Sequence, residues 1–255
     1  MESCVPDERY LSSPEFLKSA LHWFTIVEVP ILALGAFCIL YKTPPQIKSI
    51  KWLMLNLHFW SSLSDLLFSS ASIPFVLLPA PAGVGLGFIE APAVLIYCIV
   101  TVIATMATSV IAIYENRYFT LFGKNTRWEN YRKLYLSVIS SLAPAWFLPP
   151  YFYIPEQESA RAIVHQMLPC LPEYDFDGRQ LYVLALSYQV ILYCIGTGMV
   201  VISVSISVFF LLTFYNLWRN APRKTLSTRT LSMQKTLAVA LTIQVPLHFK
   251  MNFML

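Results

Sequence analysis

Charged residues are scarce in this chain. Only 13% of its 255 residues are Asp, Glu, Lys or Arg, whereas 56% are hydrophobic, and the mean hydropathy is +0.58. This composition leaves too little polar side chain to cover a water-facing surface, so it excludes a soluble globular protein. A helix needs roughly 20 residues to cross about 30 Å of hydrocarbon, so the length leaves no room for a separate soluble domain beside the spans.

The sequence also lacks the motifs of common catalytic and metal sites. It has no glycine-rich phosphate loop, no paired Cys or His at metal-ligand spacing and no nucleophile elbow. We therefore expect neither an enzyme nor a bound metal or cofactor. The net charge of +4 could suggest a nucleic-acid partner. The basic residues are divided among short loops beside hydrophobic runs, however, and this favours a lipid bilayer and no nucleic acid.

Long hydrophobic runs predict six membrane-spanning helices. They cover about residues 20–41, 52–78, 91–114, 134–154, 181–215 and 236–255. The fifth run is long enough for two helices. We expect one, because a second helix would move the following basic loop to the same side of the membrane as the acidic loop. The last run contains Lys250, whose side chain can reach outward to the interface. Pro144, Pro149 and Pro150 are expected to kink or loosen the fourth helix.

The basic residues predict which side of the membrane each loop occupies. Most of the 18 Lys and Arg residues lie in every second gap between the runs. They are Lys42, Lys48, Lys51, Arg117, Lys124, Arg127, Arg132, Lys133, Arg219, Arg223, Lys224, Arg229 and Lys235. Because such gaps face the cytosol, residues 1–19 and the acidic loop 155–180 are expected outside the cell. The predicted fold is an all-α polytopic helix bundle in the plasma membrane with an extracellular N-terminus.

Polar residues at one helix end and within the runs are candidates for function. Glu115 and Arg117 stand two positions apart, followed by Tyr118, where the third helix meets the cytosol. Arg117 could bond Glu115 in one state and a docking partner in another, or it could be a plain interfacial anchor.

The only acids inside the spans are Glu28 and Asp65. Acidic residues within a membrane are costly and therefore indicate function. His58 lies two helical turns before Asp65 on the same helix face, so the two could line one polar stripe. A hydrogen-bonded packing contact is the alternative.

The cysteines divide between the spans and the predicted outer side. Cys38, Cys98 and Cys194 fall inside hydrophobic runs, where small apolar residues are expected. Cys4 and Cys170 lie outside, in an oxidising compartment, and could form a disulfide.

Several short strings resemble a known family. They are Ser13–Leu17 (SPEFL), Lys48–Trp52 (KSIKW), Leu55–Trp60 (LNLHFW), Glu115–Tyr118 (ENRY), Leu168–Glu173 (LPCLPE) and Leu226–Lys235. Their combination, spread over about residues 4–245, resembles the nematode serpentine chemoreceptors of class H, a branch of the seven-helix G-protein-coupled receptors. The resemblance implies a receptor that detects a small odorant or other environmental chemical and signals to a heterotrimeric G protein.

The resemblance also implies roles for individual residues. Arg117 would respond to G-protein coupling, with Glu115 as its local partner and Tyr118 completing the motif, and Cys4 would be the partner of Cys170. Side chains near the depth expected for a ligand are Trp23, Phe75, Tyr97 and Tyr188.

The family continues to a seventh span and a cytoplasmic tail, whereas this chain ends in its sixth run. A non-signalling receptor fragment is therefore the alternative function. A channel or transporter is disfavoured because no inverted repeat is present.

Overall fold

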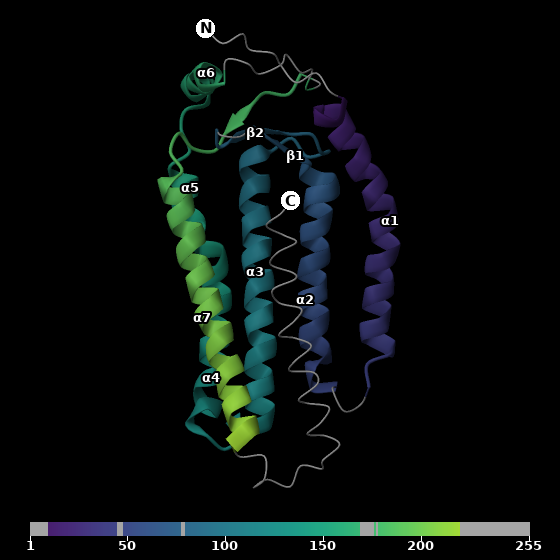
Figure 1. Cartoon of the computed structure of the whole chain (residues 1–255), viewed down its shortest axis with the longest axis vertical. Helices are drawn as coiled ribbons and strands as arrows, with labels where there is room; N and C mark the ends of the chain where they lie inside the picture. The colour runs from purple at the N-terminus through teal and green to yellow at the C-terminus, as the bar shows by residue number, and fades with distance from the viewer. Residues whose placement is uncertain (1–9, 45–47, 78–79, 169–175, 177, 220–255) are drawn as a thin grey trace.

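The long helices of this chain form a bundle that is closed at one end by a small β-sheet. The computed structural model describes residues 10–44, 48–77, 80–168, 176 and 178–219 (Figure 1). The helices that run along the bundle are α1 (Pro14–Tyr41), α2 (Lys48–Leu66), α3 (Pro92–Tyr118), α4 (Arg127–Ala145) and α7 (Gln189–Arg219). Helix α3 is the central one, because it packs against α2, α4 and α7. The prediction of a helical membrane bundle is confirmed.

A capping serine and prolines explain where α1 begins and where α4 ends. Ser13 caps α1 by accepting a hydrogen bond from the backbone N–H of Phe16 at 3.2 Å, and Pro14 occupies the first turn, where no amide donor is needed. Helix α4 contains Pro144 and ends at Ala145, and the short helix α5 (Leu148–Phe152) follows it. The expected effect of the prolines on the fourth helix is thus present.

Three described helices are long and apolar enough to cross a membrane: Pro14–Tyr41, Pro92–Gly123 and Gln189–Trp218. Helices α2 and α4 lie beside them but are shorter and more polar, with 19 residues each. The second and fifth helices are placed differently from the prediction, because residues 74–76 and 182–183 form strands instead of helix. The predicted sixth run, 236–255, lies outside the described residues.

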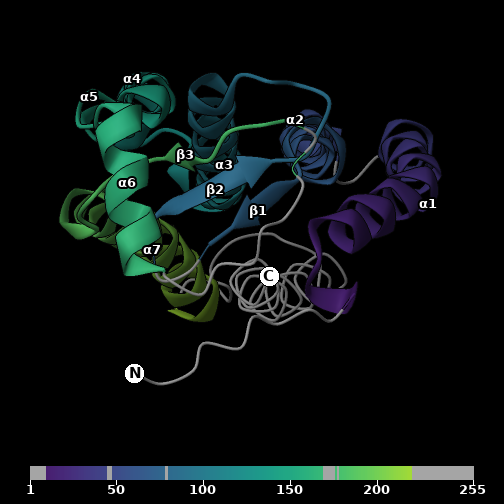
Figure 2. The ribbon, with the colours of Figure 1, turned by 90° about the horizontal axis from the view of Figure 1, so that it is seen from above.

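The sheet was not predicted from the sequence. Its strands are β1 (Pro74–Val76), β2 (Ala82–Gly85) and β3 (Tyr182–Val183), antiparallel and in the order β1-β2-β3. Seen from above, the sheet lies across the end of α3, with helix α6 (Gln157–Met167) over it (Figure 2). We call β1, β2, β3 and α6 together the cap.

The cap has its own hydrophobic core. Its buried members are Ile73, Leu77, Ala80, Ala82, Val84, Leu86, Ala160, Val164, Leu181 and Val183. Helix α6 is joined to the sheet through Gln157, whose side chain donates to the Val183 carbonyl at 3.1 Å and accepts from the Val183 N–H at 3.0 Å. Because this amide satisfies both backbone groups of Val183, the short strand β3 is held from both sides.

A widened helical turn leads from α2 into the cap. Residues Leu67–Ser72 form a π-helical turn, and Ile73 then adopts a left-handed conformation with φ 41°. The carbonyls of Ala71, Ser72 and Ile73 accept hydrogen bonds from the N–H groups of Ile89, Gly87 and Leu86. These bonds replace the helical partners that the carbonyls lose at the end of the turn. They explain how a β-branched residue is held at a positive φ.

A second buried cluster lies at the opposite end of the bundle, which we call the basic end. Ile111 and Tyr114 of α3 pack there against Phe209 of α7. Trp128 and Tyr135 of α4 add aromatic rings whose centroids lie 5.5 and 5.7 Å from that of Phe209. This cluster joins α3, α4 and α7.

Replacing Gly87 with alanine should destabilise the cap. A Cβ atom at Gly87 would lie 2.2 Å from the carbonyl oxygen of Ala71, so the backbone of the turn would have to move. We expect a loss of about 1–3 kcal/mol, measured as a lower melting temperature of the purified protein in detergent. The matched control is Gly196→Ala, because a Cβ atom there meets nothing within 4 Å. Equal melting temperatures for the two variants would contradict the proposed close approach.

Candidate functional site

The carboxylate of Glu115 is the most completely buried charge at the basic end. Glu115 is 0% exposed and lies near the end of α3. Its Oε1 accepts hydrogen bonds from Trp128 Nε1 at 2.8 Å and Arg132 Nε at 3.1 Å, and its Oε2 pairs with Arg132 Nη2 at 2.9 Å. Arg132 and Trp128 both come from α4. The carboxylate therefore joins α3 to α4 through a two-pronged ion pair and a third donor.

The guanidinium of Arg132 is held in place from two further directions. It lies over the ring of Phe119, 3.8 Å from the ring centroid, and its Nη2 is 3.4 Å from the side-chain oxygen of Asn116. Both contacts come from the chain next to Glu115. We call Glu115, Trp128 and Arg132 the α3–α4 brace.

Glu115 and Arg117, which were expected to pair in one conformation, are not paired with each other in this structure. Residues two positions apart on a helix point to different sides, so the two side chains do not face each other. Glu115 faces α4, where Arg132 takes its charge. The intervening Asn116 is what produces this spacing.

Arg117 is buried without the partner that was expected for it. Its side chain is 6% exposed, and its Nη2 atom has no hydrogen-bond partner within the part of the chain that the structure describes. Tyr118 lies next to it and packs against Phe209 of α7, with ring centroids 6.2 Å apart. The end of α3 thus carries Glu115, which faces α4 and is paired with Arg132, and the buried cation Arg117 on another side of the helix.

The two intramembrane acids differ in burial, since Asp65 of α2 is exposed. Glu28 is buried, and its Oε2 accepts a hydrogen bond from Ser69 Oγ at 3.1 Å. The carboxylate of Asp65 is close enough to interact with it electrostatically. Thr25 adds a bond to the Ser69 carbonyl at 3.2 Å. These contacts form a polar seam between the two helices.

The contacts of His58 are with α1. Its Nε2 lies 2.8 Å from the Leu32 carbonyl oxygen on α1, and its ring packs on Gly35, where a Cβ atom would come within 2.8 Å. His58 therefore joins α1 to α2 as a packing contact, which was the alternative considered for it.

Other polar contacts between helices were missed from the sequence. Asn56 of α2 donates to Ser109 Oγ of α3 at 2.8 Å and accepts from Trp60 Nε1 at 3.2 Å. Trp146 Nε1 donates to the Cys194 carbonyl of α7 at 3.0 Å. The Trp and Asn residues in these runs could have indicated such contacts, because buried indole and amide groups usually form hydrogen bonds.

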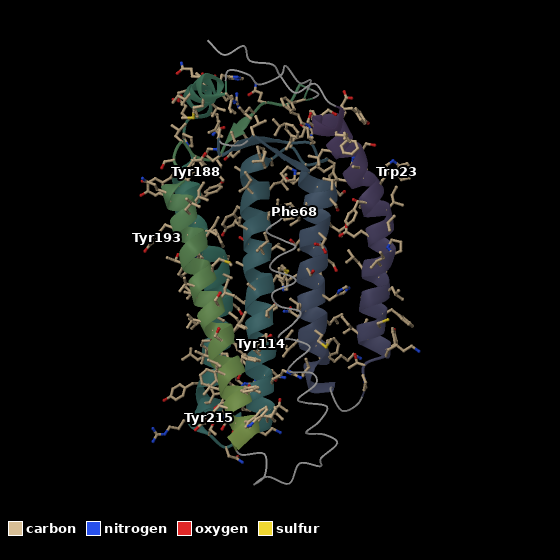
Figure 3. The ribbon with its side chains drawn as sticks, in the orientation of Figure 1. Trp23, Phe68, Tyr114, Tyr188, Tyr193 and Tyr215 are labelled. Carbon is tan, nitrogen blue, oxygen red and sulfur yellow. The ribbon has the colours of Figure 1, made fainter. Side chains whose placement is uncertain are left out.

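The four side chains chosen as ligand contacts do not meet. Trp23 is 69% exposed and lies on the side of α1 turned away from the other helices (Figure 3). Tyr188 is exposed at the start of α7, and the hydroxyl of Tyr97 donates to the Pro144 carbonyl at 3.0 Å. Phe75 lines a cavity in the cap. The depth of a residue along a helix does not fix which way its side chain points.

The cap cavity has a volume of about 620 Å³. It lies between the sheet, the start of α3 and the segment that precedes β3, and Arg161, Arg179 and Tyr182 contribute polar groups to its wall. Burial raises the pKa of Tyr182, and nearby Tyr151 raises it further. A cavity of this size is typical of small-molecule sites.

Cys4 and Cys170 lie outside the described residues, so their pairing stays a prediction. Cys38, Cys98 and Cys194 are free thiols. Within the described part of the chain, no group of three or more His, Cys, Asp or Glu side chains could hold a metal ion.

The fold defines a multi-pass helical membrane protein. It has several membrane-capable helices around a central α3, polar contacts between the helices, and a cap over one end. The family model described as "Serpentine type 7TM GPCR chemoreceptor Srh" matches residues 12–254. The chain belongs to this family of serpentine receptors, which are a non-enzymatic kind of protein. The match extends beyond residue 245, where the sequence motifs end.

A curated relative supports the same assignment. "Serpentine receptor class H-72" of Caenorhabditis elegans is 25% identical over 179 residues. The matched region covers 68% of this chain and 52% of the relative, so the chain spans about half the length of that protein. No solved structure matches the chain.

Removing Arg132 should destabilise the basic end strongly. In Arg132→Gln the carboxylate of Glu115 remains buried without its cation, which costs about 3–5 kcal/mol. Melting temperature and yield of the protein in detergent measure this loss. The double variant Glu115→Gln/Arg132→Gln should recover much of it, because no buried charge remains unpaired.

Arg127→Gln is the matched control for this test, since Arg127 is an exposed residue on the same helix. Its melting temperature should equal that of the unchanged chain. If Arg132→Gln melts like Arg127→Gln, the α3–α4 brace does not stabilise the fold.

Proposed function

We propose that this chain acts as a chemosensory receptor in the plasma membrane of a sensory cell, where it detects a small environmental chemical and signals to a heterotrimeric G protein. The observation that carries the proposal is the match of residues 12–254 to the serpentine chemoreceptor family. The polar architecture of the basic end supports it, because a buried cation lies there beside a carboxylate that is already compensated.

The proposed signalling step is a shift between two conformations. Because Arg132 already compensates Glu115, Arg117 has no ion-pair partner among the described residues, and its guanidinium is buried. A ligand that favours an open basic end would expose the Arg117 guanidinium to the G protein, with Tyr118 beside it. The ligand can shift the equilibrium only by its difference in affinity for the two conformations.

Arg117→Gln should abolish signalling while leaving the protein at the cell surface. The substitution removes a buried charge, so folding should not suffer, whereas the donor for the G protein is lost. A G-protein reporter in transfected cells, with surface expression measured in parallel, tests this. Arg127→Gln is again the control and should signal like the unchanged chain.

Two results of the reporter experiment would contradict the proposal. A full response from Arg117→Gln would remove Arg117 from the coupling step. Normal surface expression of the unchanged chain with no response to any tested chemical would favour the non-signalling fragment.

The proposed orientation places the basic end in the cytosol and the cap outside. It rests on the positive-inside rule applied to the basic loops. Single cysteines introduced at exposed Lys124 and Glu158, near opposite ends of the bundle, test it with a membrane-impermeant thiol reagent. Glu158→Cys should add labelling in intact cells, and Lys124→Cys should add labelling only after permeabilisation. The unchanged chain gives the background from the native cysteines, and the reverse pattern would overturn the orientation.

A further inference from the structure

The cap cavity has one apolar wall and one polar wall. Pro74 and Val76 of β1, Leu95 and Ile96 of α3, and Leu184 after β3 supply apolar surface. Arg161 of α6 and Arg179 and Tyr182 near β3 supply polar groups on the same cavity. A ligand that fits both walls must have an apolar body and a polar end.

The alternation of side chains along the strands places Tyr182 on the cavity side. Its neighbour Val183 is fully buried in the cap core, so Tyr182 points to the other face of the sheet. The residue opposite Tyr182 in β2 is Gly83, which has no side chain to fill the space beside the phenol ring. The backbone of β1 lies close to Gly83, so a side chain there would not fit and Tyr182 packs over a strand position without one.

The polar wall offers donors in excess of acceptors. The Tyr182 hydroxyl is buried and has no hydrogen-bond partner among the described residues. Arg161 donates from Nε to the Leu181 carbonyl at 2.7 Å and from Nη1 to Gln180 Oε1 at 2.5 Å, which leaves one donor of Nη1 and the two donors of Nη2. A ligand bound here must supply acceptors to these groups.

The charge of the polar wall is positive among the described residues. Arg179 Nη2 lies 3.4 Å from Glu90 Oε1, and its Nη1 donates to the carbonyls of Gly85 and Gly87 at 2.6 Å each. Arg161 contacts only neutral acceptors in the described part of the chain. Within the described part of the chain, the Arg161 cation is thus held by the Leu181 carbonyl and the Gln180 side chain, with no acid paired to it.

We propose that the cap cavity binds a small amphipathic carboxylate, with its apolar body against β1 and the start of α3 and its carboxylate on Arg161 and Tyr182. This inference rests on the proposed function, since it names the class of chemical that the receptor detects. A carboxylate is an acceptor-only group that a guanidinium fork and a phenol can bind together. The volume of about 620 Å³ is ample for a molecule of this kind.

The test uses hexanoate and benzoate at neutral pH, with hexanamide and benzamide as neutral isosteres. Binding is measured first, as the concentration-dependent rise in melting temperature of the purified full chain in lipid nanodiscs. The same chemicals are then applied to cells that carry the G-protein reporter. We expect the acids, and not the amides, to stabilise the chain and activate the reporter.

Tyr182→Phe is the principal variant, because the hydroxyl that it removes bonds no other described group and the fold should be unaffected. It should weaken carboxylate binding about tenfold, the loss of one hydrogen bond to a charged group. Arg161→Gln should remove the preference for acids over amides. Arg161→Lys, which keeps the charge but not the planar fork, should restore part of it.

The outcomes separate this inference from the proposed function. Equal binding of acids and amides, unchanged carboxylate affinity in Tyr182→Phe and Arg161→Gln, or no stabilisation by either acid would overturn the carboxylate site. A reporter response to neutral chemicals in such a case would leave the receptor function standing. Carboxylate binding that these variants weaken, without any reporter response, would support the site and contradict signalling.

Discussion

The ion pair between Glu115 and Arg132 is the interaction on which the basic end depends. A carboxylate with no exposed surface must be compensated within the protein, because neither water nor lipid reaches it. Arg132 and Trp128 supply three donors from one helix, and this fixes the rotation of α4 against α3. The aromatic cluster with Phe209 then sets the position of α7 against the same two helices. Charge compensation and packing therefore act on the same three helices.

The same requirement explains the other polar contacts along the bundle. Glu28 of α1 bonds Ser69 in the π-helical turn that follows α2, Asn56 bonds Ser109 across the α2–α3 interface, and Trp146 bonds a carbonyl of α7. Each contact satisfies a group that lipid could not satisfy. Association of helices in a bilayer lacks a hydrophobic driving force between them, so such bonds and close packing specify which helices are neighbours. The cap differs, because its hydrophobic core forms between a sheet and an amphipathic helix at the end of the bundle.

Much of the helical architecture could be predicted from the sequence, because charge-free runs of sufficient length have few alternatives in a chain this apolar. The end of α4 could also be predicted, because prolines interrupt a helix.

The sheet could not be predicted. Its strands are very short, and β3 pairs with a strand about 100 residues earlier in the chain, for which no local pattern exists. The residues just before α7 were therefore predicted as part of the fifth span.

The candidate site was predicted only in part, for a physical reason that differs from residue to residue. Arg132 was counted with its basic neighbours as a sign of a cytosolic loop under the positive-inside rule, and no ion pair was predicted for it. The spacing of Trp128 and Arg132, one turn apart on α4, was the signal that both face α3. The ligand contacts were chosen by their depth along the helix, which does not tell which way a side chain faces around the helix axis. Trp23 has the expected depth but points away from the bundle.

The π-helical turn at Leu67–Ser72 has a consequence for the evolution of this chain. Such a turn holds one residue more than the α-helical turn that it replaces. Loss of that one residue would convert the turn to ordinary α-helix, and the narrower turn would compensate for the missing residue, so the segment that follows would keep its direction. The six-residue turn is thus a point where a change in length of one amino acid is absorbed locally, with the hairpin of β1 and β2 left in place over the end of the bundle.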